Sequence, residues 1–153
     1  MNIEIKDKRE EAIGLVLALL QERKMFGQIT FSSFNHEVRK RLASEVNERK
    51  IDSDVTFGYL MKFRKPNFPD YEHAKPGDSI NIDIRYLENH REECLIQIKK
   101  AQEKKVKVKF WFPMDYQEEH MFYDDLLGLE VDTIITNKPV TMIEYFHAQS
   151  IKV

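Results

Sequence analysis

The stretch MNIEIKDKREEAIGLVLALL, residues 1–20, contains a strand pattern followed directly by a helix pattern. Ile3 and Ile5 alternate with polar neighbours over residues 2–6, and a period of two is typical of a strand with one polar face. The apolar positions that follow fall on one helical stripe, which predicts a helix over 7–24. Residues 1–24 therefore read as one strand–helix unit.

Five more units of the same kind follow along the chain. Each begins with a short apolar or alternating run, and the runs are 27–34, 54–60, 79–84, 106–112 and 131–136. An amphipathic helix is expected after every run except 54–60, which leads into a long loop. Asn35 is placed to cap the second helix, Asp115 with Glu118 to form a capping box for a later one, and Gly128 to end that helix. Pro139 suits the first turn of the last helix. The one long loop expected is 62–78.

Six strand–helix units in a row predict a parallel sheet with right-handed crossovers. Parallel strands covered on both faces are usually apolar throughout, but here one face is polar. It would carry Asn2, Glu4, Lys6, Asn81, Asp83, Lys107, Lys109 and Trp111. Buried charges cost several kcal/mol each when unpaired, so this face is either a functional site or simply hydrated because the sheet never closes.

Composition limits the classes of function. A chain of 153 residues is one domain in length, and its formal net charge of −2 gives no reason to expect nucleic acid as a partner. Cys94 stands alone, so neither a disulfide framework nor a cysteine zinc site is expected. A reducing intracellular compartment is the natural location, by default the cytoplasm, with an organelle left open. No transmembrane segment or targeting sequence is expected, since the longest apolar run is too short to cross a bilayer.

Four motifs in order resemble the glycerophosphodiester phosphodiesterase family. They are NIEIK at 2–6, ITFSSF at 29–34, VKFWF at 108–112 and GLEVDTIITNKP at 128–139. The last is the most specific, because it is similar to the family's final strand. The resemblance implies a (β/α)8 barrel in which NIEIK stands for the third strand, so the expected fold is α/β: an incomplete TIM-type barrel of six parallel strands. It assigns residues 2–146 to a partial family domain and leaves 147–153 as a C-terminal tail.

The resemblance also implies roles for four residues. Glu4 matches a ligand of the catalytic divalent metal, Mg²⁺ or Ca²⁺, and Lys6 matches a lysine beside the substrate phosphate. Trp111 matches a tryptophan near the glycerol moiety, and Thr136 matches the threonine of the last strand. Carboxylate oxygens suit such hard cations, and an ammonium suits the charge of a phosphodiester.

Several parts of the family pattern are absent. The His-Arg-Gly and Glu-x-Asp motifs of the first two strands do not occur, and none of the five histidines lies in such a motif. Residues 112–114 and Asn137 also depart from the pattern. A barrel without two strands exposes both edges, which favours another protein chain as a partner.

Three alternatives remain at this stage. The chain is an enzyme completed by another polypeptide that hydrolyses glycerophosphodiesters to glycerol 3-phosphate and an alcohol, and it is then inactive alone. It is otherwise a degenerate family member serving as a structural or accessory subunit. The third alternative is a fragment of a longer enzyme. In the absence of partner groups, Glu4 and Lys6 would form only a surface ion pair of little energetic weight.

Overall fold

The computed structural model describes residues 1–7, 9–27, 29–51, 55–64, 66–69, 71 and 74–149. Strands and helices alternate along them: β1 (Asn2–Glu4), α1 (Glu10–Glu22), β2 (Thr30–Ser33), α2 (His36–Glu48), β3 (Thr56–Leu60), β4 (Ser79–Asp83), α3 (Ile84–Asn89), α4 (Arg91–Glu103), β5 (Lys107–Trp111), α5 (His120–Gly128), β6 (Thr133–Ile135) and α6 (Pro139–Ala148). The predicted order is confirmed, with a helix after every strand except β3, which is followed by the expected long loop.

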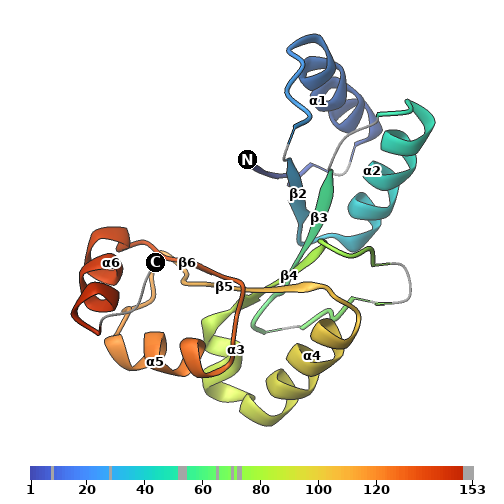
Figure 1. Ribbon diagram of the computed structural model, residues 1–153. Coiled ribbons are helices and arrows are strands. Elements are labelled where there is room, and N and C mark those ends of the chain that lie inside the picture. Colours follow the sequence, from blue (N-terminus) through green and yellow to red (C-terminus); the bar gives the residue numbers. More distant parts are fainter. Residues whose placement is uncertain are drawn as a thin grey trace.

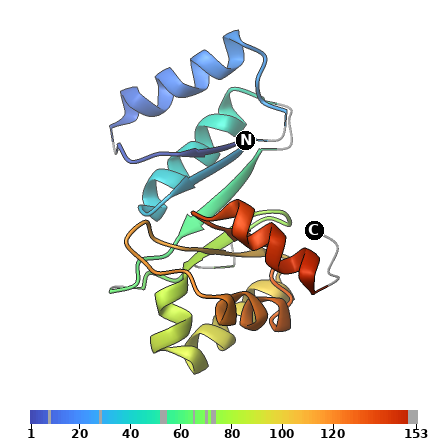
Figure 2. The same cartoon turned by 90° about the vertical axis from the view of Figure 1, so that its left-hand side faces the viewer.

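All six strands are parallel and lie in one sheet in the order β1-β2-β3-β4-β5-β6. The sheet curls strongly, and the helices lie on its outer side (Figures 1 and 2). The result is a half-open barrel whose edges are β1 and β6, which confirms the predicted incomplete TIM-type architecture. Every βα unit adds one strand to the growing edge, as expected for right-handed crossovers.

Two apolar clusters lie between the outer face of the sheet and its helices. One is built by β1 to β3 with α1 and α2, around residues such as Leu17, Phe31 and Leu42. The other is built by β3 to β6 with α3 to α6, around residues such as Ile82, Phe110 and Tyr123. Because these residues alternate along their strands, the inner face receives the polar ones, as the sequence predicts.

Some local predictions are confirmed and others are wrong. Asn35 caps α2 by accepting a hydrogen bond from Glu37 N, and Pro139 opens α6. The single helix expected after β4 is two helices, because His90 has φ −139° and ψ 47° and interrupts the helical backbone. The capping box is wrong: α5 begins later, after Glu119, which makes no side-chain capping bond.

The end of α5 also differs from the sequence-based expectation. Gly128 is its last helical residue, whereas the left-handed conformation belongs to Glu130, with φ 52°. The helix α6 continues to Ala148, two residues into the predicted tail 147–153. Residues 150–153 lie outside the described part of the chain, and the division into domain and tail stays a prediction.

The long loop between β3 and β4 is anchored at its end by a buried carboxylate. Asp78 accepts hydrogen bonds from Phe57 N at 2.8 Å and Lys75 N at 3.0 Å. It also forms an ion pair of 2.9 Å with Arg39, whose guanidinium lies 4.8 Å from the centre of the Tyr59 ring. This anchor sets where β4 begins and fixes α2 against the sheet.

Candidate functional site

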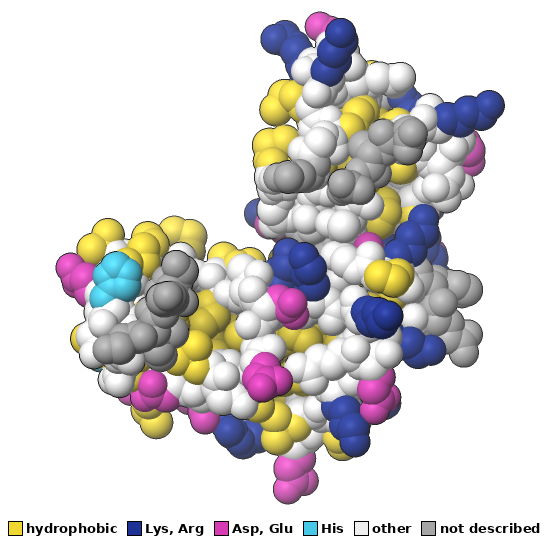
Figure 3. Space-filling model, in the orientation of Figure 1, with side chains coloured by type: hydrophobic (Ala, Val, Ile, Leu, Met, Phe, Trp, Pro, Cys, Tyr) yellow, Lys and Arg dark blue, Asp and Glu magenta, His cyan; other side chains and the backbone are white. Residues whose placement is uncertain are grey.

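The carboxyl ends of parallel strands share one rim of the barrel, where the loops that follow them meet. Two adjoining pockets lie along this rim and share Phe34 and Lys62. In Figure 3 the molecule is hollowed between its two arms, and basic and acidic side chains lie together in that hollow. The rim is therefore the candidate functional site.

The first pocket has a volume of about 470 Å³ and contains two of the predicted residues. Its lining is Glu4, Ile5, Lys6, Ser33, Phe34, Asn35 and Lys62. Lys6 Nζ lies 3.8 Å from Glu4 Oε1, and the lysine side chain is 81% exposed, so the pair is loose and contributes little to stability. Lys62 Nζ lies 5.9 Å from the centre of the Phe34 ring. Two ammonium groups thus reach one pocket from neighbouring loops.

The amino end of α2 opens beside this pocket. Ser33 Oγ donates to Ile5 O at 2.8 Å and accepts from Asn35 N at 3.1 Å, which fixes the turn between β2 and α2. Asn35 then caps a helix of 13 residues. The positive end of a helix dipole favours anions, and it adds to the charge of Lys6 and Lys62 here.

The second pocket, of about 370 Å³, is lined by Phe34, Lys62, Phe63, Arg64, Asp83, Arg85 and Trp111. Asp83 is 1% exposed and engaged by Arg85 through bonds of 2.6 Å (Nη2–Oδ2) and 3.0 Å (Nε–Oδ1). Hydrogen bonding to Asp83 raises the pKa of Arg85 above its ordinary value. Because this carboxylate is already neutralised, Lys62 and Arg64 leave the pocket basic.

The aromatic wall of the second pocket is formed by two rings. Trp111 meets Phe34 edge to face, with ring centres 6.1 Å apart. The indole Nε1 is buried and has no hydrogen-bond partner among the described residues. A buried donor without a partner costs free energy. Trp111 therefore presents the pocket with an apolar ring, while its N–H is shielded from solvent.

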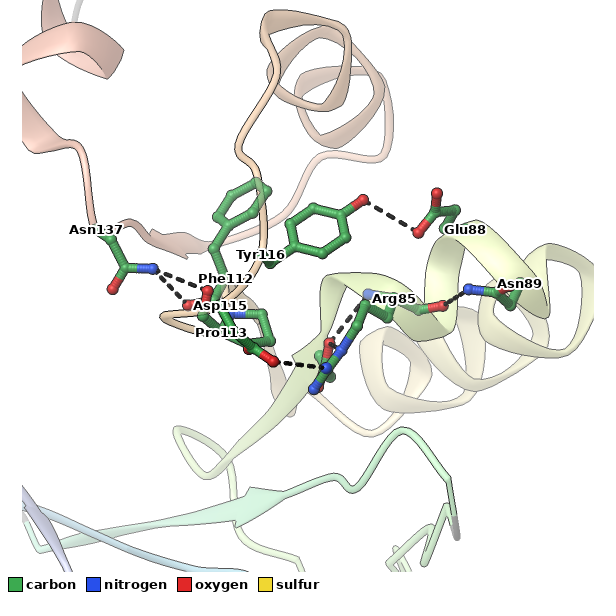
Figure 4. A network of polar contacts seen from close by, with 9 residues as sticks. Arg85, Glu88, Asn89, Phe112, Pro113, Asp115, Tyr116 and Asn137 are labelled. Carbon is green, nitrogen blue, oxygen red and sulfur yellow. Dashed lines mark hydrogen bonds and ion pairs between the residues drawn. The ribbon is translucent and has the colours of Figure 1, made fainter.

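A chain of polar contacts extends from Arg85 to the loop before α5 (Figure 4). Arg85 Nη1 lies 3.9 Å from Asp115 Oδ2, and Tyr116 OH donates to Glu88 at 3.1 Å. Asn137 Nδ2 donates to the carbonyl oxygens of Phe112 and Pro113. These contacts fix the loop next to Trp111 from two sides.

Thr136 lies apart from the other predicted residues. Its hydroxyl donates to Glu118 Oε2 at 2.5 Å and accepts from Lys138 N at 2.8 Å. Glu118, 7% exposed, also accepts from Tyr123 OH at 3.0 Å and from Asn137 N at 2.7 Å. Glu118 thus joins the loops after β5 and β6, and the substrate role expected of Thr136 stays a prediction.

A histidine at the start of α2 fastens the long loop to the rim. His36 Nε2 lies 3.3 Å from Asn67 Nδ2, which also donates to Phe34 O at 3.1 Å. Burial lowers the pKa of His36 below its ordinary value. Neutral His36 can accept the bond from Asn67, so this contact holds the loop that carries Lys62.

The described residues do not by themselves make a divalent-metal site. Among them no three His, Cys, Asp or Glu side chains are grouped closely enough to hold an ion. Glu4 is the carboxylate of the first pocket, and Asp83, that of the second, is held by Arg85. Mg²⁺ and Ca²⁺ generally need more oxygen ligands than one carboxylate offers.

Within the described part of the chain, no helix combines the length and apolar character needed to cross a bilayer.

The sequence predicted Glu4, Lys6 and Trp111 on the polar inner face of the sheet as site residues, and it missed three basic residues that line the same pockets. Lys62, Arg64 and Arg85 come from loops or helix starts directly after β3 and β4. The run KFRK at 62–65 follows a strand, and a basic run at that position is a usable signal of an anion site.

Comparison with known proteins finds similar folds among the solved structures. No protein-family model and no curated protein matches the sequence. A candidate glycerophosphodiester phosphodiesterase from Galdieria sulphuraria matches 95% of this chain over 56% of its own, with TM-score 0.75 and 22% identity. The chain shares that fold.

Two further crystal structures agree. A glycerophosphodiester phosphodiesterase from Parabacteroides distasonis matches 97% of this chain with TM-score 0.60 and 14% identity. A candidate glycerophosphoryl diester phosphodiesterase from Silicibacter pomeroyi matches 97% with TM-score 0.68 and 17% identity. The chain spans between 50% and 57% of the length of these three structures. The resemblance predicted from the motifs is thereby confirmed at the level of the fold.

Proposed function

We propose that this chain binds the phosphate of a glycerophosphodiester, or of glycerol 3-phosphate, at the carboxyl-end rim, and does not hydrolyse it alone. One observation carries the proposal: Lys6 and Lys62 reach the same pocket beside the amino end of α2. Two ammonium groups and a helix dipole suit a phosphate anion. The fold it shares with phosphodiesterases supports the choice of ligand.

The adjoining pocket is proposed to receive the glyceryl part. Phe34 and Trp111 give it an apolar wall against which the carbon atoms of the glyceryl group can pack. Because Phe34 and Lys62 line both pockets, a ligand of this size can contact both at once. Thr136 is left out of this binding site, since its hydroxyl is committed to Glu118.

We assign hydrolysis to none of the described residues. Glu4 is proposed as a ligand of Mg²⁺ or Ca²⁺ only in an assembly in which another polypeptide segment adds further oxygen ligands. Within this chain Glu4 makes only a loose, exposed ion pair with Lys6, so the Lys6 ammonium stays available to an anion. Phosphate binding by the chain alone therefore needs no metal.

A titration of glycerol 3-phosphate followed by NMR tests the proposal. We expect saturable shifts of amides at the carboxyl ends of β1, β2 and β5, with and without Mg²⁺. Lys62→Met should weaken binding about tenfold, the effect of losing one charge-assisted contact. Lys99→Met, on the exposed side of α4, is the matched control. Binding that Lys62→Met leaves intact would show that the anion lies elsewhere.

An accessory-subunit role is the second candidate function, and the open edges of the barrel favour it. Strands β1 and β6 each lack a neighbour on one side within the described sheet, and exposed strand edges recruit partners. A partner chain at these edges would be recognised by hydrogen exchange: the amides of β1 and β6 should exchange rapidly in the isolated chain and slowly in the assembly. Unchanged exchange in both states would count against this role.

A further inference from the structure

Helix α1 is apolar on its exposed side as well as on its buried side. Its inner stripe, with Ile13 and Leu17, is at most 1% exposed. On the outer side, however, Leu15 is 71% exposed and Leu19 is 54% exposed. Figure 3 shows hydrophobic side chains exposed beside α1. A helix that is apolar all round is normally covered on all sides, so this outer face lacks a covering element within the described chain.

The position of α1 leaves this face accessible. The helix packs against α2 on one flank and belongs to the unit of β1, the edge strand of the sheet. No further helix lies beyond α1 in Figure 2. Among the described residues, the apolar outer face is therefore left uncovered, and a second protein can approach it.

The charges that flank the two leucines are arranged symmetrically. Residues four apart are neighbours on a helix surface, and Glu11, Leu15, Leu19 and Arg23 follow one another at that spacing. All four are exposed. Leu15 and Leu19 lie at equal distances on either side of Leu17, and so do Glu11 and Arg23.

This order makes the stripe complementary to itself. Two α1 helices can pack through their outer faces, antiparallel to each other, with the twofold axis level with position 17 along the helix. Leu15 of each copy then faces Leu19 of the other. Glu11 of each then faces Arg23 of the other. The ion-pair partner of Arg23 among the described residues is the exposed Glu22, at 3.6 Å, and such a pair is weak enough to exchange. Glu11 has no ion pair with any described residue.

We propose that α1 is a homodimerisation surface that binds α1 of a second copy of this chain in an antiparallel arrangement. The occupant is a second copy because the charge order favours one, and closed twofold dimers are the commonest oligomers. The proposal is independent of phosphate binding, since none of these residues lines the rim pockets.

Sedimentation of the full chain over a concentration series tests the proposal. We expect reversible conversion from 18.3 kDa to a species of twice that mass. Leu15→Gln with Leu19→Gln should raise the dissociation constant by at least about tenfold, because two apolar side chains per copy lose their burial. Ile96→Gln, at another exposed apolar position with 53% exposure, should leave it unchanged.

Charge exchange gives a sharper test that does not depend on stability. Glu11→Lys alone and Arg23→Glu alone should each weaken self-association, because like charges then face one another. A mixture of the two variants should form a heterodimer, since both facing pairs regain opposite charges. A chain that stays monomeric at all concentrations, or a mixture no tighter than its components, would overturn the proposal.

Discussion

Replacing Glu118 should destabilise the protein far more than replacing its neighbour. Its buried carboxylate accepts three hydrogen bonds, from Tyr123 OH at 3.0 Å, Thr136 Oγ1 at 2.5 Å and Asn137 N at 2.7 Å. Hydrogen bonds to charged groups contribute about 1.5–3 kcal/mol each, and bonds that share one acceptor do not add fully. Glu118→Ala should therefore lower the free energy of unfolding by about 3–5 kcal/mol, a large part of the roughly 5–15 kcal/mol of a typical domain.

Urea unfolding followed by circular dichroism measures this loss. Glu118→Gln keeps the side-chain volume and one carbonyl oxygen, so we expect a smaller loss of about 1–3 kcal/mol. Glu119→Ala is the matched control, because Glu119 is exposed and makes no side-chain capping bond. Its effect should stay within about 0.5 kcal/mol.

The fluorescence of Trp111, the only tryptophan, adds a local readout. Asn137 holds the backbone at Phe112 and Pro113, directly after Trp111. Release of this loop in Glu118→Ala should change the tryptophan emission of the folded protein. If Glu118→Ala lowers the free energy of unfolding no more than Glu119→Ala does, the three hydrogen bonds to Glu118 do not stabilise the fold as proposed.

Three further variants test other contacts. Arg39→Ala leaves Asp78 buried without its ion-pair partner and should cost about 3–5 kcal/mol in urea unfolding; Lys40→Ala, which removes an exposed pair, should cost less than about 1 kcal/mol, and equal losses would contradict the burial argument. Because the pKa of His36 is lowered in the folded protein, the unfolded chain binds the proton more readily, and the free energy of unfolding should fall as the pH drops below about 6.5. His36→Phe should flatten this part of the pH profile of stability. An unchanged profile would assign the pH dependence to another group. Gly58→Ala would place a Cβ 3.0 Å from the Asn81 side chain and should cost about 1–3 kcal/mol, whereas a neutral result would show that the inner face repacks freely.

The order and direction of the strands could be predicted from the sequence, because the alternation of apolar and polar residues that marks each strand is a local pattern. Alternation at Ile3 and Ile5, and again at Val106 to Phe110, comes from the period of the strand itself. The cap at Asn35 is equally local, since its partner Glu37 is two residues away. Parallel strands in sequence order then leave β1 and β6 as the edges.

The contacts that the sequence could not supply join different βα units. Glu118 has the spacing of a capping box with Asp115, but its partners Thr136 and Asn137 belong to the following unit and compete successfully for the carboxylate. Asp83 was expected on the polar inner face together with Lys107 and Lys109, but the alternation of residues did not show that its partner is Arg85. Such choices depend on burial, which no local pattern reports.

Only some of the residues that line the rim pockets were predicted, because the others reach the rim through contacts between different βα units. Glu4, Lys6 and Trp111 were assigned through the family resemblance, and the curl of the sheet brings them to adjoining pockets. Lys62 joins them only because the loop after β3 turns back over the β2–α2 turn, where Asn67 contacts Phe34 and His36. The approach of Lys62 to the first pocket thus depends on tertiary contacts of the long loop, which no local sequence pattern reports.

A crystal structure of the chain with glycerol 3-phosphate is the most direct test of phosphate binding at the rim. We expect a phosphate in contact with the ammonium groups of Lys6 and Lys62 at the amino end of α2, with the glyceryl group against Trp111. A phosphate bound away from this rim, or none at a concentration of ligand that saturates in solution, would contradict it.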